Sequence, residues 1–201
     1  MKSTEKQKFA RQRFDWLKQG LQNNLVPAFM ERGFEVASQP TTSDPVDREF
    51  VLSFPTWGRL RRFRESAVDL VEIQLAPHRR AAFRINAGVA PRAGNSAHGE
   101  RQAGDQVPVH TLEERFETHA RPWLRPLLRG LRLEPLCAWF SVGHHPFRPA
   151  VKDDFEGLAL RAASVIPELE LALREGKTGP HVRRVRIPWS RRPAVRGAET
   201  R

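Results

Sequence analysis

The sequence predicts an α+β protein with a mainly antiparallel sheet of about four to five strands and helices packed on one face of the sheet. Segments that alternate apolar and polar residues, as half-buried strands do, cluster in the middle of the chain. Segments whose apolar residues recur three or four positions apart, as in amphipathic helices, lie before and after this cluster. Strands grouped in this way favour antiparallel pairing.

The N-terminal segment, residues 3–32, predicts one long amphipathic helix. Its apolar stripe comprises Phe9, Trp16, Leu17, Leu21, Leu25, Ala28 and Phe29. Pro27 predicts a kink, because proline has no backbone N–H to donate, and Gly33 is placed to end the helix.

Two strands are predicted before the centre of the chain. Apolar and polar residues alternate over Glu49–Phe54, which is the first of them. The second, Arg59–Arg64, carries four arginines around Leu60 and Phe63. This composition favours an exposed edge strand, because charged side chains discourage edge-to-edge pairing.

The stretch VDLVEIQLAPHRRAAFRINAGVA predicts a β-hairpin and is the most regular pattern in the chain. Pairing Ile73 with Phe83 keeps the apolar faces of its two strands together. The same register sets Glu72 opposite Arg84, a favourable cross-strand charge pair. It predicts a turn of three or five residues within Ala76–Arg80.

After the hairpin, residues 91–108 lack periodicity and predict a mobile loop. Thr111 and Glu114 have the spacing of a capping box and predict the start of a helix. Alternation over Leu136–Val142 predicts a further strand.

The C-terminal part of the chain predicts a last helix. Asp153 and Glu156 form a second capping box at its start. Pro167 should kink this helix, and Gly176 is placed to end it.

Length and composition suit one α+β domain at residues 1–176, followed by a basic tail or final strand at residues 177–201. The 201 residues are 39% hydrophobic and include 12 Phe and 5 Trp, which is enough for a real core. Cys137 is the only cysteine, so an internal disulfide is excluded. The chain has no long apolar run and no signal-like N-terminus, so we expect a cytoplasmic protein without membrane contact.

The positive charge is concentrated at the C-terminus. The formal net charge is +11, of which residues 177–201 contribute +7. Clustered arginines neutralise phosphates, and a tryptophan among them can stack on a base. Nucleic acid or an acidic protein is therefore the expected partner of Arg183, Arg184, Arg186, Trp189, Arg191 and Arg192. The alternative is that Val182, Val185 and Ile187 form a final strand on the sheet.

A second candidate binding surface is the polar face of the hairpin. Alternation places Glu72, Gln74, Arg84 and Asn86 on the side of the sheet opposite its main apolar set. These side chains could engage a ligand or pair with one another.

Three groups of residues have side chains that could support chemistry. His144 and His145 with Asp153 and Asp154 lack a third ligand at a diagnostic spacing, so we expect neither a metal nor a cofactor. Cys137 lies in an alternating apolar strand, where a buried cysteine is typical.

The third constellation would make the chain a metal-dependent nuclease. Asp69, Glu72 and Gln74 have residue types that hold a divalent metal in such enzymes. All three lie on one strand, however, and Asp69 projects to the face opposite Glu72 and Gln74.

Several short patterns resemble the bacterial "domain of unknown function 4304" family over about residues 15–145. They are Gly33-Phe34 after a helix, Gln74 at the end of a strand, the strand Phe83–Gly88 and the aromatic pair Trp139-Phe140. The resemblance implies a small α+β domain and brings no established activity, ligand or catalytic residue. It also implies that Gln74 and Asn86 occupy polar positions, which either cap the sheet or line a binding face.

The sequence thus predicts a non-catalytic binding or accessory module that engages nucleic acid or an acidic partner through arginine-rich surface. The alternatives are the metal-dependent nuclease and a protein–protein adaptor. An exposed apolar patch on the first helix would be the sign of the adaptor.

Overall fold

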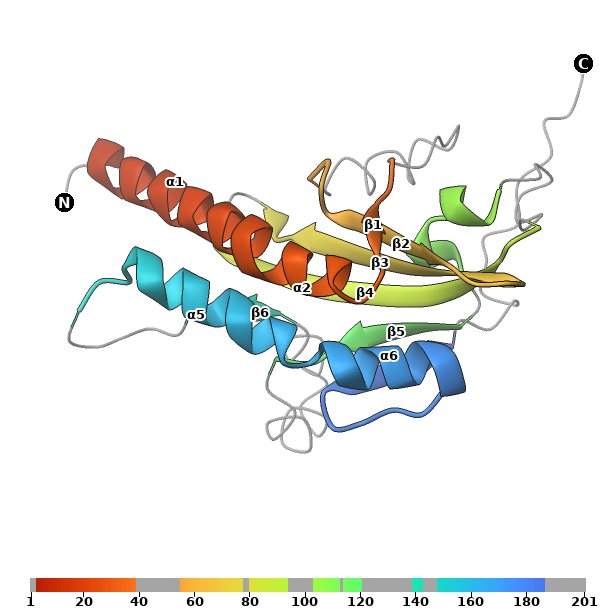
Figure 1. The fold of residues 1–201 in the computed structure, drawn as a ribbon. Coiled ribbons are helices and arrows are strands. Elements are labelled where there is room, and N and C mark those ends of the chain that lie inside the picture. The colour runs from red at the N-terminus through yellow and green to blue at the C-terminus, as the bar shows by residue number, and fades with distance from the viewer. Residues whose placement is uncertain are drawn as a thin grey trace, which may run out of the picture.

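A computed structural model of the chain describes residues 3–38, 55–77, 80–93, 103–112, 114–120, 139–142 and 148–186. It confirms an α+β fold built on one antiparallel sheet (Figure 1). Over these described ranges the sheet has seven strands, so the predicted count of four to five is too low. Its order is β1-β2-β3-β4-β5-β7, and β6 pairs with β4 beside β5.

The strands are β1 (Glu35–Val36), β2 (Arg59–Phe63), β3 (Ala67–Leu75), β4 (Ala82–Pro91), β5 (Glu114–Thr118), β6 (Phe140–Ser141) and β7 (Val182–Arg186). The helices are α1 (Ser3–Gly20), α2 (Val26–Met30), α5 (Lys152–Ala163) and α6 (Ile166–Glu175). A π-helical turn, η1 (Leu21–Leu25), joins α1 to α2, and two 3₁₀ turns, η4 (Gly104–Gln106) and η5 (Val109–Thr111), precede β5.

The predicted N-terminal helix is confirmed, with a widened turn just before Pro27. The Val26 N–H bonds the carbonyl of Leu21 across this turn, which is the spacing of a π-helix. Pro27 occupies the first turn of α2, where its missing N–H costs nothing. Gly33 has φ of 80° and ends the helix, as expected of a glycine that adopts the left-handed conformation.

Within the described ranges, the helices α1, α2, α5 and α6 lie on one face of the sheet, where the main core forms (Figure 1). Helices α1 and α5 approach closely at Gly20, because an added Cβ there would lie 3.0 Å from the carbonyl oxygen of Phe155. Val71, Ile73, Phe83 and Ile85 contribute the sheet side of this core.

The hairpin of β3 and β4 is confirmed, but its predicted register is wrong by two residues. Ile73 pairs with Ile85, so Glu72 faces Asn86 rather than Arg84. The Ala76 N–H bonds the Ala82 carbonyl at 2.9 Å, and the connection is longer than the predicted turn. A shift of two residues exchanges no side chain between faces, so burial patterning alone cannot exclude it.

Two further predictions between the helices are wrong. Strand β2 is not an edge strand, because β1 and β3 pair with its two sides, and its Arg59 side chain is buried. Thr111 and Glu114 do not start a helix: Thr111 ends η5, and Glu114 begins β5. Part of the predicted loop 91–108 forms η4, and Pro91 ends β4.

The C-terminal helix is confirmed as two pieces, α5 and α6, with Pro167 in the first turn of α6. Gly176 ends α6 with φ of 68°. The predicted capping box of Asp153 and Glu156 is wrong by two residues, because Val151 is the N-cap and the Asp154 carboxylate accepts its N–H at 2.9 Å. Beyond α6, β7 pairs with β5 as a final strand.

Other predictions fall partly or wholly outside the described residues. These are the strand Glu49–Phe54, residues 136–138 of the strand Leu136–Val142, and Cys137, His144 and His145. Within the described part of the chain, none of the helices has the length and apolar character that crossing a bilayer would require.

Candidate binding face

Polar side chains gather on the sheet face opposite the helices. Cross-strand pairing places five residues in one row over five strands, and paired residues share a face. The row is Arg59, Glu72, Asn86, Glu117 and Arg183. With their same-face neighbours they define the polar face: Arg59, Glu72, Gln74, Arg84, Asn86, Arg115, Glu117 and Arg183.

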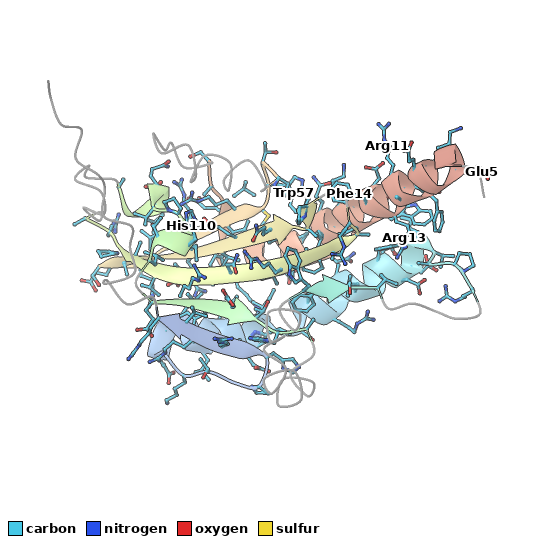
Figure 2. All side chains as sticks on the ribbon, turned by 180° about the vertical axis from the view of Figure 1, so that it is seen from behind. Glu5, Arg11, Arg13, Phe14, Trp57 and His110 are labelled. Atoms are coloured by element: carbon cyan, nitrogen blue, oxygen red, sulfur yellow. The ribbon has the colours of Figure 1, made fainter. Side chains whose placement is uncertain are left out.

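One end of this side of the sheet is apolar and is covered by residues 103–112, here called the cover segment. Val107, Val109 and Leu112 of the cover segment pack on Val68, Leu70 and Ala90 of the hairpin. Figure 2, seen from behind, shows His110 of this segment over the strands. The cover segment therefore closes a second, smaller core and borders the polar face.

Glu72 and Arg59 are buried where the cover segment meets the polar face. The Val109 N–H donates to Oε1 of Glu72 at 3.1 Å. Nη2 of Arg59 donates to the carbonyls of Val107 at 2.8 Å and Asp105 at 3.0 Å. Oε2 of Glu72 and Nε and Nη1 of Arg59 are buried without a hydrogen-bond partner among the described residues.

Burial dominates the electrostatics of this pair. It raises the pKa of Glu72, although the charge of Arg59 and the hydrogen bond from Val109 act in the opposite direction. Burial likewise lowers the pKa of Arg59, against the nearby charges of Glu72 and Asp105. Each charge is thus only partly compensated by the other.

The outer part of the polar face combines arginines with an aromatic ring. Nε of Arg84 donates to Oε1 of Gln74, and the Arg84 guanidinium carbon lies 5.3 Å from the centre of the Trp139 ring. Arg115 bonds Oε1 of Glu117 at 3.2 Å. Burial lowers the pKa of Arg84, although the charge of Glu117 raises it. Nearby negative charge therefore only partly offsets the cost of burying the charged Arg84 guanidinium.

Comparison with known proteins finds no match. Neither a protein-family model, nor a curated protein, nor a solved structure matches this chain. The resemblance to the domain of unknown function 4304 family therefore stays a prediction.

The structure brings together five of the candidate residues: Glu72, Gln74, Arg84, Asn86 and Arg183. It does not place the three arginines of β7 on the same face of the sheet. Arg184 and Arg186 share the other face of the strand, where both approach the Glu114 carboxylate, at 2.7 and 3.7 Å. Trp189, Arg191 and Arg192 lie outside the described residues.

The nuclease constellation is not assembled. Asp69 faces the helices, where its carboxylate bonds Arg62 at 2.9 Å and also bonds Arg64. Glu72 faces the cover segment on the other side of the sheet. A search of the described parts of the chain finds no group of three or more His, Cys, Asp or Glu side chains that could hold a metal.

Sequence reasoning missed four members of the site: Arg59, Arg115, Glu117 and Trp139. Arg115 and Glu117 flank Phe116 in strict alternation, which is a strand signal. The capping-box spacing of Thr111 and Glu114 concealed that signal. The four arginines of residues 59–64 favour an exposed edge strand, because charge discourages edge-to-edge pairing. Arg59 is buried instead, with hydrogen-bond partners from a distant part of the chain.

Proposed function

We propose that this protein is a non-catalytic binding module whose polar face holds single-stranded nucleic acid. The observation that carries the proposal is the Arg84 guanidinium beside the Trp139 ring, on a face that also presents Arg115 and Arg183. Such a combination offers charge to phosphates and an aromatic surface to bases. A nucleic-acid ligand also fits the cytoplasmic location that the sequence predicts.

Charge favours a phosphate-bearing ligand. The polar face holds four arginines and two glutamates, so cationic side chains are in excess. Arg84 is partly removed from water, and this burial lowers its pKa. A phosphate placed against the guanidinium would stabilise its positive charge in place of the lost water. Contacts of this kind release counterions and make binding depend steeply on salt.

Geometry favours a single strand over a duplex. The Trp139 ring stands beside strand β4 and is partly exposed, and bases stack on such rings only when they are unpaired. An antiparallel sheet offers a broad surface on which successive nucleotides can lie. Arg183 at the sheet edge would then meet the backbone of the strand.

The other candidate functions have less support. A nuclease needs carboxylates that converge on a metal, and Asp69 and Glu72 lie on opposite faces. An adaptor on the first helix needs an exposed apolar patch, and no large exposed apolar side chain is found among the described residues of α1.

The test is binding of a fluorescent single-stranded oligonucleotide, measured by anisotropy over a salt series. Arg84→Gln and Arg183→Gln should each weaken binding and reduce the slope of log K against log salt by about 0.7. Trp139→Ala should cost about 1–3 kcal/mol of binding free energy. Arg11→Gln, which removes an exposed arginine of α1, is the matched control and should leave binding unchanged.

Point substitutions are preferred to deletion of residues 177–201, because deletion would also remove β7 from the sheet. An acidic protein partner would be indicated instead if polyglutamate competed fully with the oligonucleotide and Trp139→Ala had no effect. Equal affinities for all variants would contradict the proposed face. Magnesium-dependent loss of the oligonucleotide would contradict a non-catalytic role.

A further inference from the structure

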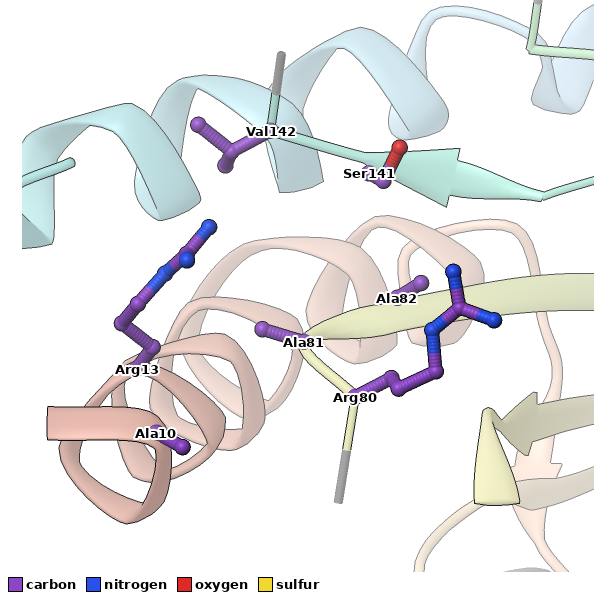
Figure 3. A pocket seen from close by; sticks show the side chains of 7 residues that line it. All are labelled: Ala10, Arg13, Arg80, Ala81, Ala82, Ser141 and Val142. Atoms are coloured by element: carbon purple, nitrogen blue, oxygen red, sulfur yellow. The ribbon is translucent and has the colours of Figure 1, made fainter. Parts of the chain in front are cut away.

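A pocket of about 390 Å³ lies at the end of the sheet, between α1, the start of β4 and β6. Arg13 of α1 and Arg80, which precedes β4, line one side of the pocket. Ser141 of β6 and the following Val142 lie across from them (Figure 3). Three alanines supply the rest of the lining: Ala10, Ala81 and Ala82. Because the alanine side chains are short, the space between the two arginines stays open.

The two arginines of this pocket differ in exposure, because Arg13 is half-buried and Arg80 is exposed to solvent. No acidic residue is among the described side chains that line it. Nε of Arg13 is buried without a hydrogen-bond partner in the described part of the chain. By contrast, Arg61, Arg62 and Arg64 each bond a carboxylate. The positive charge of the pocket is therefore not balanced by any acidic side chain of its described lining.

Arg13 is held in place by aromatic rings rather than by an acid. Its guanidinium carbon lies 5.8 Å from the ring centre of Phe9 and 5.8 Å from that of Phe155. Rings at this distance attract the guanidinium without neutralising its charge. Figure 2 shows Arg13 on the side of α1 that faces α5, whereas Arg11 points outward. The Arg13 side chain is thus positioned before any ligand arrives, which reduces the entropy lost on binding.

We propose that this pocket binds the phosphate group of a small organic phosphate monoester. Two guanidinium groups from separate elements present more N–H donors and more charge than a single carboxylate can use. A phosphate monoester carries nearly two negative charges and three terminal oxygens, which suits both groups. The Ser141 hydroxyl is a further donor at the rim of the pocket.

The size of the pocket limits the rest of the ligand. Small-molecule sites span about 300–1,000 Å³. A volume of about 390 Å³ is therefore sufficient for the phosphate and a single ring, such as a sugar or a phenyl group. This site is independent of the proposed nucleic-acid face, and binding to it is measurable without nucleic acid.

The experiment is calorimetric titration of the full chain with phenyl phosphate and with benzoate, which share the ring and differ in the anion. We expect phenyl phosphate to bind and benzoate to bind at least about tenfold more weakly. Arg13→Gln and Arg80→Gln should each weaken phenyl phosphate about tenfold or more, and Arg11→Gln should not. Ala10→Leu, which fills the pocket without changing its charge, should also weaken binding.

The folded state of each variant is checked by its circular dichroism spectrum, and Ala10→Leu remains informative if Arg13→Gln does not fold. Equal binding of benzoate, or equal binding of phenyl phosphate by all variants, would overturn the proposal. So would the absence of phenyl phosphate binding to the unaltered chain. None of these results depends on whether the polar face binds an oligonucleotide.

Discussion

Two glutamates of this protein should change its stability with pH in opposite directions. The charge of one is poorly balanced by its neighbours, and the charge of the other is bonded by two arginines. Glu72 is buried next to Arg59 without direct contact to its guanidinium among the ion pairs described, and its pKa is raised. Glu170 bonds Arg32 and Arg62, and its pKa is lowered. Single glutamine substitutions separate the two cases.

For Glu72, burial favours the protonated form in the folded state. A raised pKa contributes stability below the ordinary glutamate pKa of about 4.3, and that contribution is lost as the pH rises through the raised value. We expect the unfolding free energy of the Glu72→Gln variant, minus that of the unaltered protein, to increase over this interval. Urea unfolding at a series of pH values measures it, and a pH-independent difference would contradict the raised pKa.

For Glu170, burial alone would raise the pKa, but hydrogen bonds from Arg62 and Arg32 together with their charges outweigh it. Its contribution is present above the ordinary glutamate pKa and is lost as the pH falls through the lowered value. Glu170→Gln should therefore cost about 2 kcal/mol at neutral pH. This loss of unfolding free energy should become smaller in acid, and urea unfolding at a series of pH values measures it. A loss that became larger in acid would contradict the lowered pKa of Glu170.

At the scale of single elements, the cover segment depends on a close approach of its backbone to β4. A methyl group on Gly104 would overlap the carbonyl oxygen of Pro91. Gly104→Ala should therefore lift the cover segment from Val68 and Leu70 and destabilise the fold by about 2 kcal/mol. Faster hydrogen exchange at the Val109 N–H, which bonds Glu72, would report the loss of contact.

Gly157 is the matched control for this substitution. An added Cβ there meets only Nη1 of Arg161, at 3.6 Å, and the residue lies inside α5. Gly157→Ala should therefore stabilise the protein by up to about 1 kcal/mol, because alanine favours the helix. Normal exchange at Val109 in the Gly104→Ala variant would show that the cover segment tolerates the methyl group.

How far the elements follow from sequence depends on the range of the interactions that decide them. Alternation placed Glu72, Gln74, Arg84 and Asn86 on one face correctly, because a side chain's face is a local property of the strand. Register is not local, since every shift by two residues keeps the same faces. The pairing of Glu72 with Asn86 instead of Arg84 depends on the length of the turn.

The same distinction explains the elements that were assigned wrongly. The Arg59 side chain is buried because carbonyls of Asp105 and Val107, more than forty positions away in sequence, accept its N–H groups. The local sequence around Arg59 therefore does not predict these hydrogen-bond partners. Thr111 and Glu114 have a capping-box spacing, whereas Glu114–Thr118 also alternates as a strand does. Only the pairing of this segment with β4 and β7 decides for the strand.

For the whole molecule, one face of the sheet carries the main core, and the other is the face that we propose for binding. Helices cover the first face and form the main core there. The second face is covered by residues 103–112 at one end and presents arginines and Trp139 beyond them. Of this arrangement, the sequence predicted the helical side and part of the polar face. It did not predict the cover segment, because residues 103–112 carry no periodicity.

The most direct test of the binding face is to locate a bound strand on the protein. A single-stranded oligonucleotide that contains 5-bromodeoxyuridine would be irradiated with the full chain, and the crosslinked peptides identified by mass spectrometry. We expect the crosslink at Trp139, next to Arg84, and none at Trp16, which packs against Phe155 in the helical layer. Crosslinks confined to the helices would contradict the proposal that the polar face is the binding surface. A Trp139 crosslink that persisted in the Arg84→Gln variant at high salt would contradict it as well.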